Sequence, residues 1–352
     1  MGVRLMYMGN RMKKMLLSCT AHFACIVMCV MLLAGCFLSG CTISTKKRAE
    51  MRIGLVVEGK SGDGGVYDAA RSGLKGIETR YGVKTAEYEC CNDTEALAEK
   101  IKTAAEESDV VFVVGNNASL TAVDAASNYG SVKFICYIDN IPERSIPQNV
   151  HLIAFCFDKA MFIGGYIAAS MTQTGIIGGL TEQSFSDELM TYFNAGAVYV
   201  RENIESVSFK YESTDGRKRI KEKAYDVFDS GADVVLTTVS NDNSLRAAAR
   251  ETRNFLIEID YMKNVYSSDE LLCRIVFDIE QSIIDTAALL FTSSDWEGGL
   301  SSKLDISTEY LIIDYTAAVS KFYISDELRQ EIDKVILDVN DGSIKIEPQG
   351  EA

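Results

Sequence analysis

Three aspartates that follow predicted strands are the side chains best placed to bind a small polar ligand. Asp63 lies in a glycine-rich loop after the first predicted strand, Asp139 follows the strand Lys133–Ile138, and Asp260 follows Phe255–Ile259. Carboxylates at the carboxyl ends of parallel strands point into the crevice where such sheets bind ligands. They accept strong, charge-assisted hydrogen bonds from polar hydrogens. The local alternatives are an Asp-Gly turn for Asp63 and a cap on the next turn for Asp139.

Other kinds of chemistry find no matching pattern. His151 lies in an apolar strand with no Cys or His nearby, which favours a structural role, and two His with scattered Cys argue against a metal centre. Gly178-Gly179 follows a strand, but no phosphate-loop motif continues it. No nucleophile elbow or catalytic triad is present. We therefore expect no enzyme, no catalytic residue, no metal and no cofactor.

Alternating strand and helix patterns must position these side chains. Predicted strands are Arg52–Val57, Lys84–Glu89, Val110–Val114, Lys133–Ile138, His151–Phe157, Gly175–Leu180, Ser206–Tyr211, Asp233–Thr238 and Phe255–Ile259. Predicted helices are Tyr67–Tyr81, Asp93–Glu107, Ser119–Tyr129, Lys159–Gln173, Ser186–Asn203, Arg217–Gly231 and Asn243–Arg253. This alternation predicts an α/β fold with parallel sheets. Nine strands exceed one comfortable sheet, so two lobes with a ligand cleft between them are expected.

Composition limits the classes of function. Hydrophobic residues make up 47% of the 352 residues, which is enough for a folded core. The chain has 50 acidic and 35 basic residues and a net charge of −15. A nucleic-acid partner is not expected, because phosphate binding needs an excess of Lys and Arg.

The N-terminal segment has the layout of a bacterial lipoprotein leader. Lys13-Lys14 precede an apolar run over residues 15–35 that ends in Leu-Ala-Gly-Cys36. We expect residues 1–35 to be a signal peptide, Cys36 to carry the lipid, and residues 36–50 to be a tether. Cys41 follows a second, similar sequence and is the alternative lipidation site. An uncleaved membrane anchor is the other reading of the apolar run.

The order of motifs along residues 51–348 resembles the basic membrane protein family, whose members are substrate-binding lipoproteins of nucleoside ABC transporters. The most specific stretch is Ile163-Gly-Gly-Tyr-Ile-Ala-Ala-Ser-Met-Thr-Gln-Thr-Gly175. The ending Ile336–Pro348 also matches the family's tail. The resemblance implies a two-lobed type I periplasmic-binding-protein fold. Its expected parts are lobe 1 at 51–155, lobe 2 at 156–260, and a return segment at 261–352 that mostly completes lobe 1.

The resemblance also implies roles for particular residues. Asp63 occupies one of the family's paired Asp positions, and Asp260 matches its ribose-binding Asp. Three departures follow: Gly65-Val66-Tyr67 replaces Ser-Phe-Asn, Gly115-Asn116 replaces Gly-Phe, and Phe277 takes the place of a Lys expected in a helix, with Arg274 one turn earlier. Tyr67 is then a candidate for the lost stacking surface or a surface aromatic. Asn116 and Asn117 are candidates for hydrogen bonds to a base or sugar edge.

These features predict a lipid-anchored solute-binding protein of an ABC importer that faces outside the cytoplasm. The expected partners are a nucleoside-like small molecule, a transporter permease and the membrane that holds the anchor. One alternative is a ligand-sensing lipoprotein of the same fold that signals to a membrane partner. Another is a degenerate binding scaffold.

Overall fold

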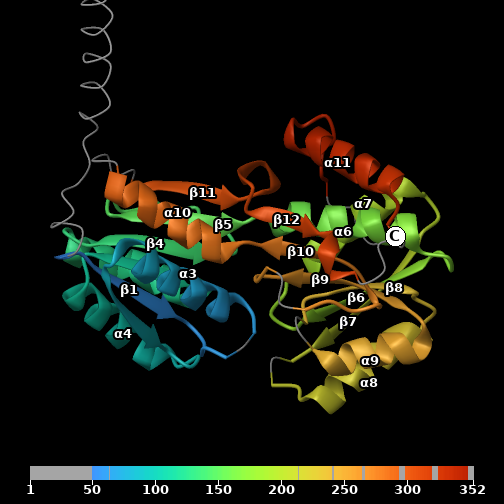
Figure 1. Ribbon diagram of the computed structural model, residues 1–352, viewed down its shortest axis with the longest axis horizontal. Helices are drawn as coiled ribbons and strands as arrows, with labels where there is room; N and C mark the ends of the chain where they lie inside the picture. Colours follow the sequence, from blue (N-terminus) through green and yellow to red (C-terminus); the bar gives the residue numbers. More distant parts are fainter. Residues whose placement is uncertain are drawn as a thin grey trace, which may run out of the picture.

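Two lobes, each a six-stranded sheet flanked by helices, make up the protein (Figure 1). The computed structural model describes residues 50–62, 64–212, 214–239, 242–263, 266–292, 298–318 and 324–347. The two-lobed α/β architecture expected from the sequence is confirmed. The leader, both candidate lipidation sites Cys36 and Cys41, and Asp63 lie outside the described residues.

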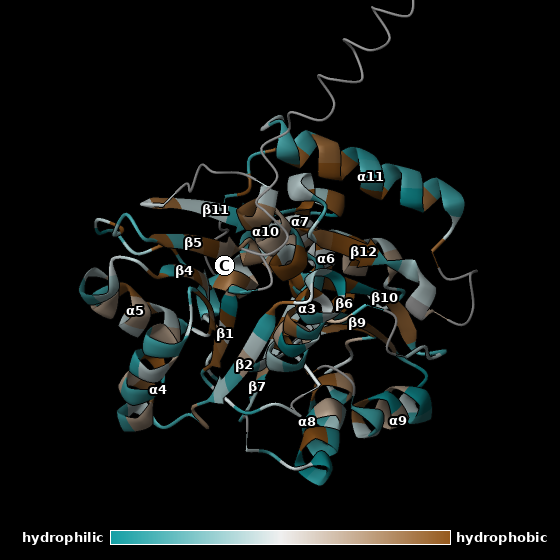
Figure 2. Ribbon diagram, turned by 60° about the vertical axis from the view of Figure 1, so that its left-hand side comes forward, coloured by the Kyte–Doolittle hydropathy of each residue, from teal (hydrophilic) through white to brown (hydrophobic). Residues whose placement is uncertain are grey.

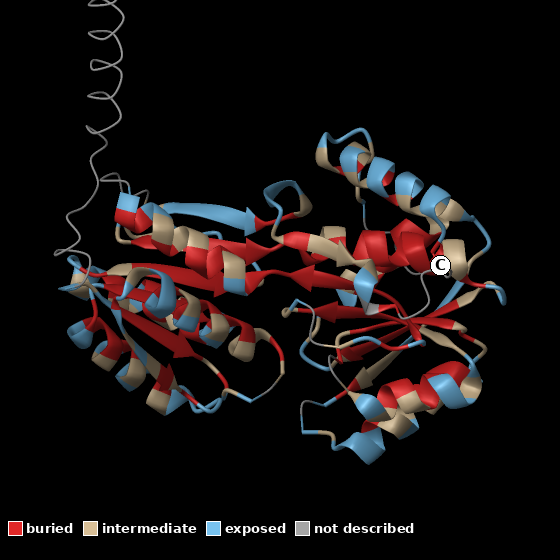
Figure 3. Ribbon diagram, in the orientation of Figure 1, coloured by how far each residue is buried: buried red, intermediate tan, exposed pale blue. Residues whose placement is uncertain are grey.

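Lobe 1 contains a fully parallel sheet. Its strands, in spatial order, are β11 (Leu300–Leu304), β5 (Val150–Phe155), β4 (Lys133–Ile138), β3 (Val110–Val114), β1 (Arg52–Val57) and β2 (Lys84–Glu89). Its helices are α3 (Val66–Tyr81), α4 (Thr94–Glu107), α5 (Asn116–Ala125) with the 3-10 turn η1 (Ala126–Tyr129), and α10 (Ile279–Thr292). The central strands are buried on both faces and are therefore almost wholly apolar (Figure 3).

Lobe 2 repeats this plan with one antiparallel strand at its edge. Its strands, in spatial order, are β12 (Leu311–Asp314), β10 (Leu271–Phe277), β9 (Phe255–Asp260), β8 (Val234–Thr237), β6 (Ile176–Glu182) and β7 (Glu205–Tyr211). Its helices are α6 (Phe157–Met171), α7 (Asp187–Val200), α8 (Arg217–Asp229), α9 (Asn243–Thr252) and α11 (Asp326–Asn340). The outer helices α8, α9 and α11 turn hydrophilic faces outward, whereas α6 is almost wholly buried (Figure 2).

The segment after residue 260 is divided between the lobes. Strand β10 joins the second sheet, α10 packs on α3 of lobe 1, β11 adds an exposed edge to the first sheet, and β12 returns to the second. Phe277 and Arg274 therefore lie in a strand rather than in the helix that the resemblance implied. The seven residues of β10 are all buried, which suits a strand covered on both faces better than an amphipathic helix.

Three crossings carry the chain between the lobes, because β5, β10 and β11 are each followed by an element of the other lobe. Among the described residues, no helix is both long and apolar enough to cross a bilayer.

Candidate functional site

A carboxylate organises the edge of lobe 1 where β1 and β3 end. Glu58, directly after β1, accepts hydrogen bonds from the backbone N–H of Asn117 (2.9 Å), the side-chain amide of Asn117 (2.6 Å) and the N–H of Ala118 (3.2 Å). It thereby caps the start of α5, where unpaired N–H groups and the helix dipole favour an anion. Gly115 makes room for it: its φ is 124°, and a Cβ there would lie 2.5 Å from the Glu58 Cβ.

Asn116 and Asp139 bind each other across neighbouring strand ends. The Asn116 side-chain amide donates to Asp139 Oδ2, and the Asp139 backbone N–H donates to Asn116 Oδ1 at 2.8 Å. Burial raises the pKa of Asp139, the hydrogen bond from Asn116 opposes this increase, and the charge of Glu58 adds to it. The pair leaves a half-buried carboxylate at the carboxyl end of β4.

Tyr67 lies in the first turn of α3, directly after the glycine-rich loop that follows β1. Its ring occupies the space beside Gly59, where an added Cβ would lie 2.3 Å from a ring carbon. Asp68 accepts hydrogen bonds from the N–H groups of Gly62 (2.7 Å) and Gly64 (2.8 Å), so it shapes the glycine-rich loop. Sequence reasoning missed Asp68. Its position at the first turn of α3, four residues after Gly64, was the available signal.

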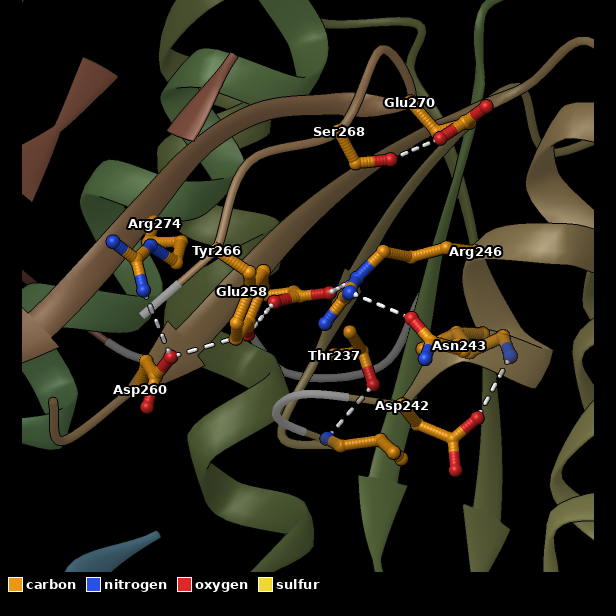
Figure 4. Close-up of polar contacts among 12 residues, drawn as sticks. Thr237, Asp242, Asn243, Arg246, Glu258, Asp260, Tyr266, Ser268, Glu270 and Arg274 are labelled. Atoms are coloured by element: carbon orange, nitrogen blue, oxygen red, sulfur yellow. Dashed lines mark hydrogen bonds and ion pairs between the residues drawn. The ribbon is translucent and has the colours of Figure 1, made fainter. Parts of the chain in front are cut away.

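Asp260 is enclosed in lobe 2 (Figure 4). Its Oδ1 accepts from the backbone N–H groups of Tyr261 (2.7 Å) and Met262 (3.3 Å). Its Oδ2 lies 3.4 Å from Arg274 Nη1 and 3.1 Å from the Tyr266 hydroxyl. Both oxygens are therefore engaged within the protein, and the residue is only 1% exposed.

Arg274 links this carboxylate to the edge strand. It is fully buried, and its other terminal nitrogen pairs with Asp314 of β12. Two carboxylates around one guanidinium supply the compensation that a buried charge requires. The guanidinium of Arg274 is therefore already balanced by Asp260 and Asp314.

A second buried ion pair lies beside it (Figure 4). Glu258 of β9 accepts from Arg246 Nε at 3.3 Å and from the Tyr266 hydroxyl. The Arg246 guanidinium stacks 3.7 Å from the Tyr266 ring centroid, and its Nη2 has no hydrogen-bond partner among the described residues. Burial raises the pKa of Glu258 to about 7, although Arg246 and the hydrogen bond from Tyr266 oppose the increase.

Tyr261 lies where the two lobes meet, and the sequence analysis did not select it. Its ring stacks on Phe277 (centroids 6.1 Å apart) and meets the edge of Phe155, the last residue of β5 in lobe 1 (5.9 Å). An aromatic directly after Asp260, at a strand end, was the signal that could have found it.

A polar hollow of about 350 Å³ lies on lobe 2 beside α9. It is lined by Asn243, Arg246, Arg250, Ser267, Ser268 and Asp269. Its arginines are already paired, Arg246 with Glu258 and Arg250 with Glu270.

The structure thus brings Asn116 and Asp139 together, and it gives the other expected residues that it describes different neighbours. Asn117 donates a hydrogen bond to Glu58, Tyr67 packs on Gly59, and Asp260 pairs with Arg274. What remains at the carboxyl edges is a set of hydrogen-bond acceptors beside an aromatic junction. Such a set can hold a small molecule that carries polar hydrogens.

Solved structures share this fold. An ABC transporter system solute-binding protein from Conexibacter woesei superposes with a TM-score of 0.69 at 15% identity, covering 85% of this chain and 99% of that one. A transcriptional activator of the comK gene from Bacillus halodurans superposes with a TM-score of 0.65 at 18% identity, covering 83% and 99%. The chain therefore has the two-lobed type I periplasmic-binding-protein fold.

Sequence comparison identifies the family to which the chain belongs. The model of the Bmp family, described as ABC transporter substrate-binding protein PnrA-like, matches residues 50–346, and the chain belongs to this family. Basic membrane protein D of Borreliella burgdorferi (strain JD1) is 21% identical over 282 residues, which is 78% of this chain and 82% of that protein. The resemblance read from the motifs is confirmed, and the family is one of substrate-binding proteins.

Proposed function

We propose that this protein is the lipid-anchored, extracytoplasmic substrate-binding component of an ABC importer. Its membership of a substrate-binding family carries the proposal. The leader sequence supports lipidation at Cys36, with Cys41 as the alternative. A transporter permease is the partner that such a component serves.

The ligand that we propose is small, rich in hydrogen-bond donors and nucleoside-like, and it binds between the carboxyl edges of the two sheets. Open α/β sheets bind ligands at this edge. The half-buried carboxylate of Asp139 supports the choice of a donor-rich ligand. An ionised carboxylate accepts hydrogen bonds but cannot donate them. Binding to both lobes would shift the protein toward a closed state, which a transporter can recognise.

A thermal-stability screen of the full chain in mild detergent tests this proposal. The panel contains nucleosides, free bases, sugars and amino acids. A ligand at 100 times its Kd is expected to stabilise the folded state by about 2.7 kcal/mol. A shift with nucleosides supports the proposal, and a shift with another class alone keeps the importer and discards the nucleoside. No shift with any class, together with capture of a membrane protein partner, would favour a sensor instead.

A further inference from the structure

Tyr261 is held in place by a series of buried contacts that ends at the lobe junction. Asp314 and Asp260 pair with Arg274, and Asp260 Oδ1 in turn accepts the backbone N–H of Tyr261 at 2.7 Å. A carboxylate fixed by a buried guanidinium has little freedom to turn outward. Because Asp260 accepts the N–H of Tyr261, it fixes the backbone from which the Tyr261 side chain projects.

The ring of Tyr261 has aromatic support from both lobes. Phe277 of lobe 2 stacks against it at an interplanar angle of 26°, and Phe155 of lobe 1 meets it edge-on at 76°. The side chain is half-buried, so part of its surface stays accessible beside these rings. A partly exposed aromatic residue that is held by two other rings can offer a stacking surface to a flat ligand ring.

The charges near Tyr261 are negative. Removal from water raises the pKa of the Tyr261 hydroxyl well above its usual value, and the carboxylates of Asp139, Asp260 and Glu182 add to this increase. The hydroxyl therefore stays protonated and neutral. Asp139 comes from lobe 1 and Glu182 from the end of β6 in lobe 2, so carboxylates of both lobes are close enough to act on it.

The charge of Asp260 is balanced by Arg274, but those of Asp139 and Glu182 have no such partner in the ranges that the structure describes. Arg274 is paired with Asp260 and Asp314, and Lys263 is paired with Asp278. No ion pair among the described residues includes Asp139 or Glu182. An anionic ligand would meet the carboxylates of Asp139 and Glu182, which are in no ion pair within the described part of the chain, and this repulsion costs binding energy.

We propose that Tyr261 is the lobe 2 residue on which the ligand stacks, that Asp260 positions it rather than binding the ligand, and that the ligand is an uncharged or cationic molecule with a flat ring. This inference rests on the proposed function and narrows it. It predicts that a nucleoside binds whereas the corresponding nucleoside monophosphate does not.

The test measures calorimetric binding of inosine, adenosine and their 5′-monophosphates to the full chain in detergent. Tyr261→Leu keeps an apolar side chain between Phe155 and Phe277 but removes the flat face, and Tyr261→Phe keeps the face. Tyr199→Leu is the matched control, because Tyr199 is 55% exposed on α7. Melting curves of the unliganded variants establish that each is folded.

The proposal expects nucleoside affinity to fall about tenfold or more in Tyr261→Leu, in line with the loss of one aromatic stacking contact. Tyr261→Phe and Tyr199→Leu should stay within about threefold of the original protein, and the monophosphates should bind at least tenfold more weakly than the nucleosides.

Unchanged nucleoside binding in a folded Tyr261→Leu variant overturns the role of Tyr261 and leaves the proposed function standing. Equal binding of the monophosphates overturns the charge selection. Failure of the original protein to bind any nucleoside overturns the nucleoside-like ligand and, with it, this inference.

Discussion

Arg274 and Asp260 form a buried ion pair in lobe 2, with Nη1 and Oδ2 3.4 Å apart and side chains that are 0% and 1% exposed. A strand-end carboxylate in this fold can face a ligand, but here it faces the protein's own guanidinium. The residue that the resemblance assigns to ribose therefore has a structural partner, and substitutions at Asp260 will affect folding as well as binding.

Replacement of Asp260 by Ala is expected to lower the free energy of unfolding by about 3 kcal/mol. Removal of one partner of a buried pair leaves an uncompensated charge, and here two backbone N–H groups also lose their acceptor. Urea unfolding at pH 7 measures the loss. The double variant Asp260→Ala/Arg274→Met should recover part of it, since no buried guanidinium remains. A single variant as stable as the original protein would contradict this reading.

Glu258 should make stability depend on pH in a direction opposite to that of most carboxylates. Its folded-state pKa of about 7 lies above the ordinary value of 4.5, so below pH 4.5 it is protonated in both states. As pH rises from 4.5 to 7, the unfolded chain ionises first and folding loses stability. Well above pH 7 both states are ionised and the penalty is constant.

The measurement compares unfolding free energies of the original protein and Glu258→Gln between pH 4.5 and 8. Gln keeps the acceptor that faces Arg246 and Tyr266 but cannot titrate. The original protein should lose stability relative to the variant as pH rises to about 7 and then run parallel to it. Parallel curves over the whole range would show that folding does not change the pKa of Glu258.

Much of the fold followed from sequence periodicity, because parallel strands buried on both faces read as apolar runs. Strands β1 to β4 match their predicted ranges residue for residue. Prediction failed after residue 260, for identifiable reasons. Arg274 interrupts the apolar run of β10, and β11 is a polar, exposed edge strand whose sequence Leu-Ser-Ser-Lys-Leu carries no burial signal.

The candidate site was predicted less well, since a residue type does not reveal which neighbour it will bind. Asp139 and Asn116 were both selected, but their mutual hydrogen bonds depend on the spacing of β3 and β4. Asp260 has as partner a guanidinium from the next strand, which only the register of β9 and β10 brings close. Tyr261 gains its place from contacts with Phe155, more than a hundred residues earlier in the chain.

The glycines of the family-like stretch also gain a physical explanation. Gly165 of α6 and Gly196 of α7 lie at a close helix crossing, where a Cβ on Gly165 would be 1.9 Å from the carbonyl oxygen of Phe193. A Cβ on Gly196 would be equally close to the carbonyl oxygen of Phe162. Gly165 of the motif is therefore required for the close packing of α6 on α7 in lobe 2.

Gly165→Ala is accordingly expected to cost at least about 2 kcal/mol of stability, because the two helices must move apart to admit a methyl group. Thermal and urea unfolding give the value. Gly130→Ala is the control: nothing lies within 4 Å of its Cβ position and its φ is −58°, so the change should be neutral or slightly stabilising. Equal effects of the two substitutions would argue against a tight crossing.

Asp139 provides the most direct test of a carboxylate that binds the ligand from lobe 1. Asp139→Asn preserves the shape of the side chain but removes its charge, and it converts one acceptor oxygen into a donor. We expect nucleoside affinity to fall about tenfold, since hydrogen bonds to a charged group contribute about 1.5–3 kcal/mol.

The pKa of Asp139 is raised by burial, so acidification should protonate it sooner than an exposed Asp and weaken binding in the original protein. Calorimetry between pH 4 and 7 measures both effects, and the variant should show the weaker, flatter pH profile. A variant that binds as tightly as the original protein at pH 7 would remove Asp139 from the site, and a pH dependence shared by both proteins would assign the titration to another group.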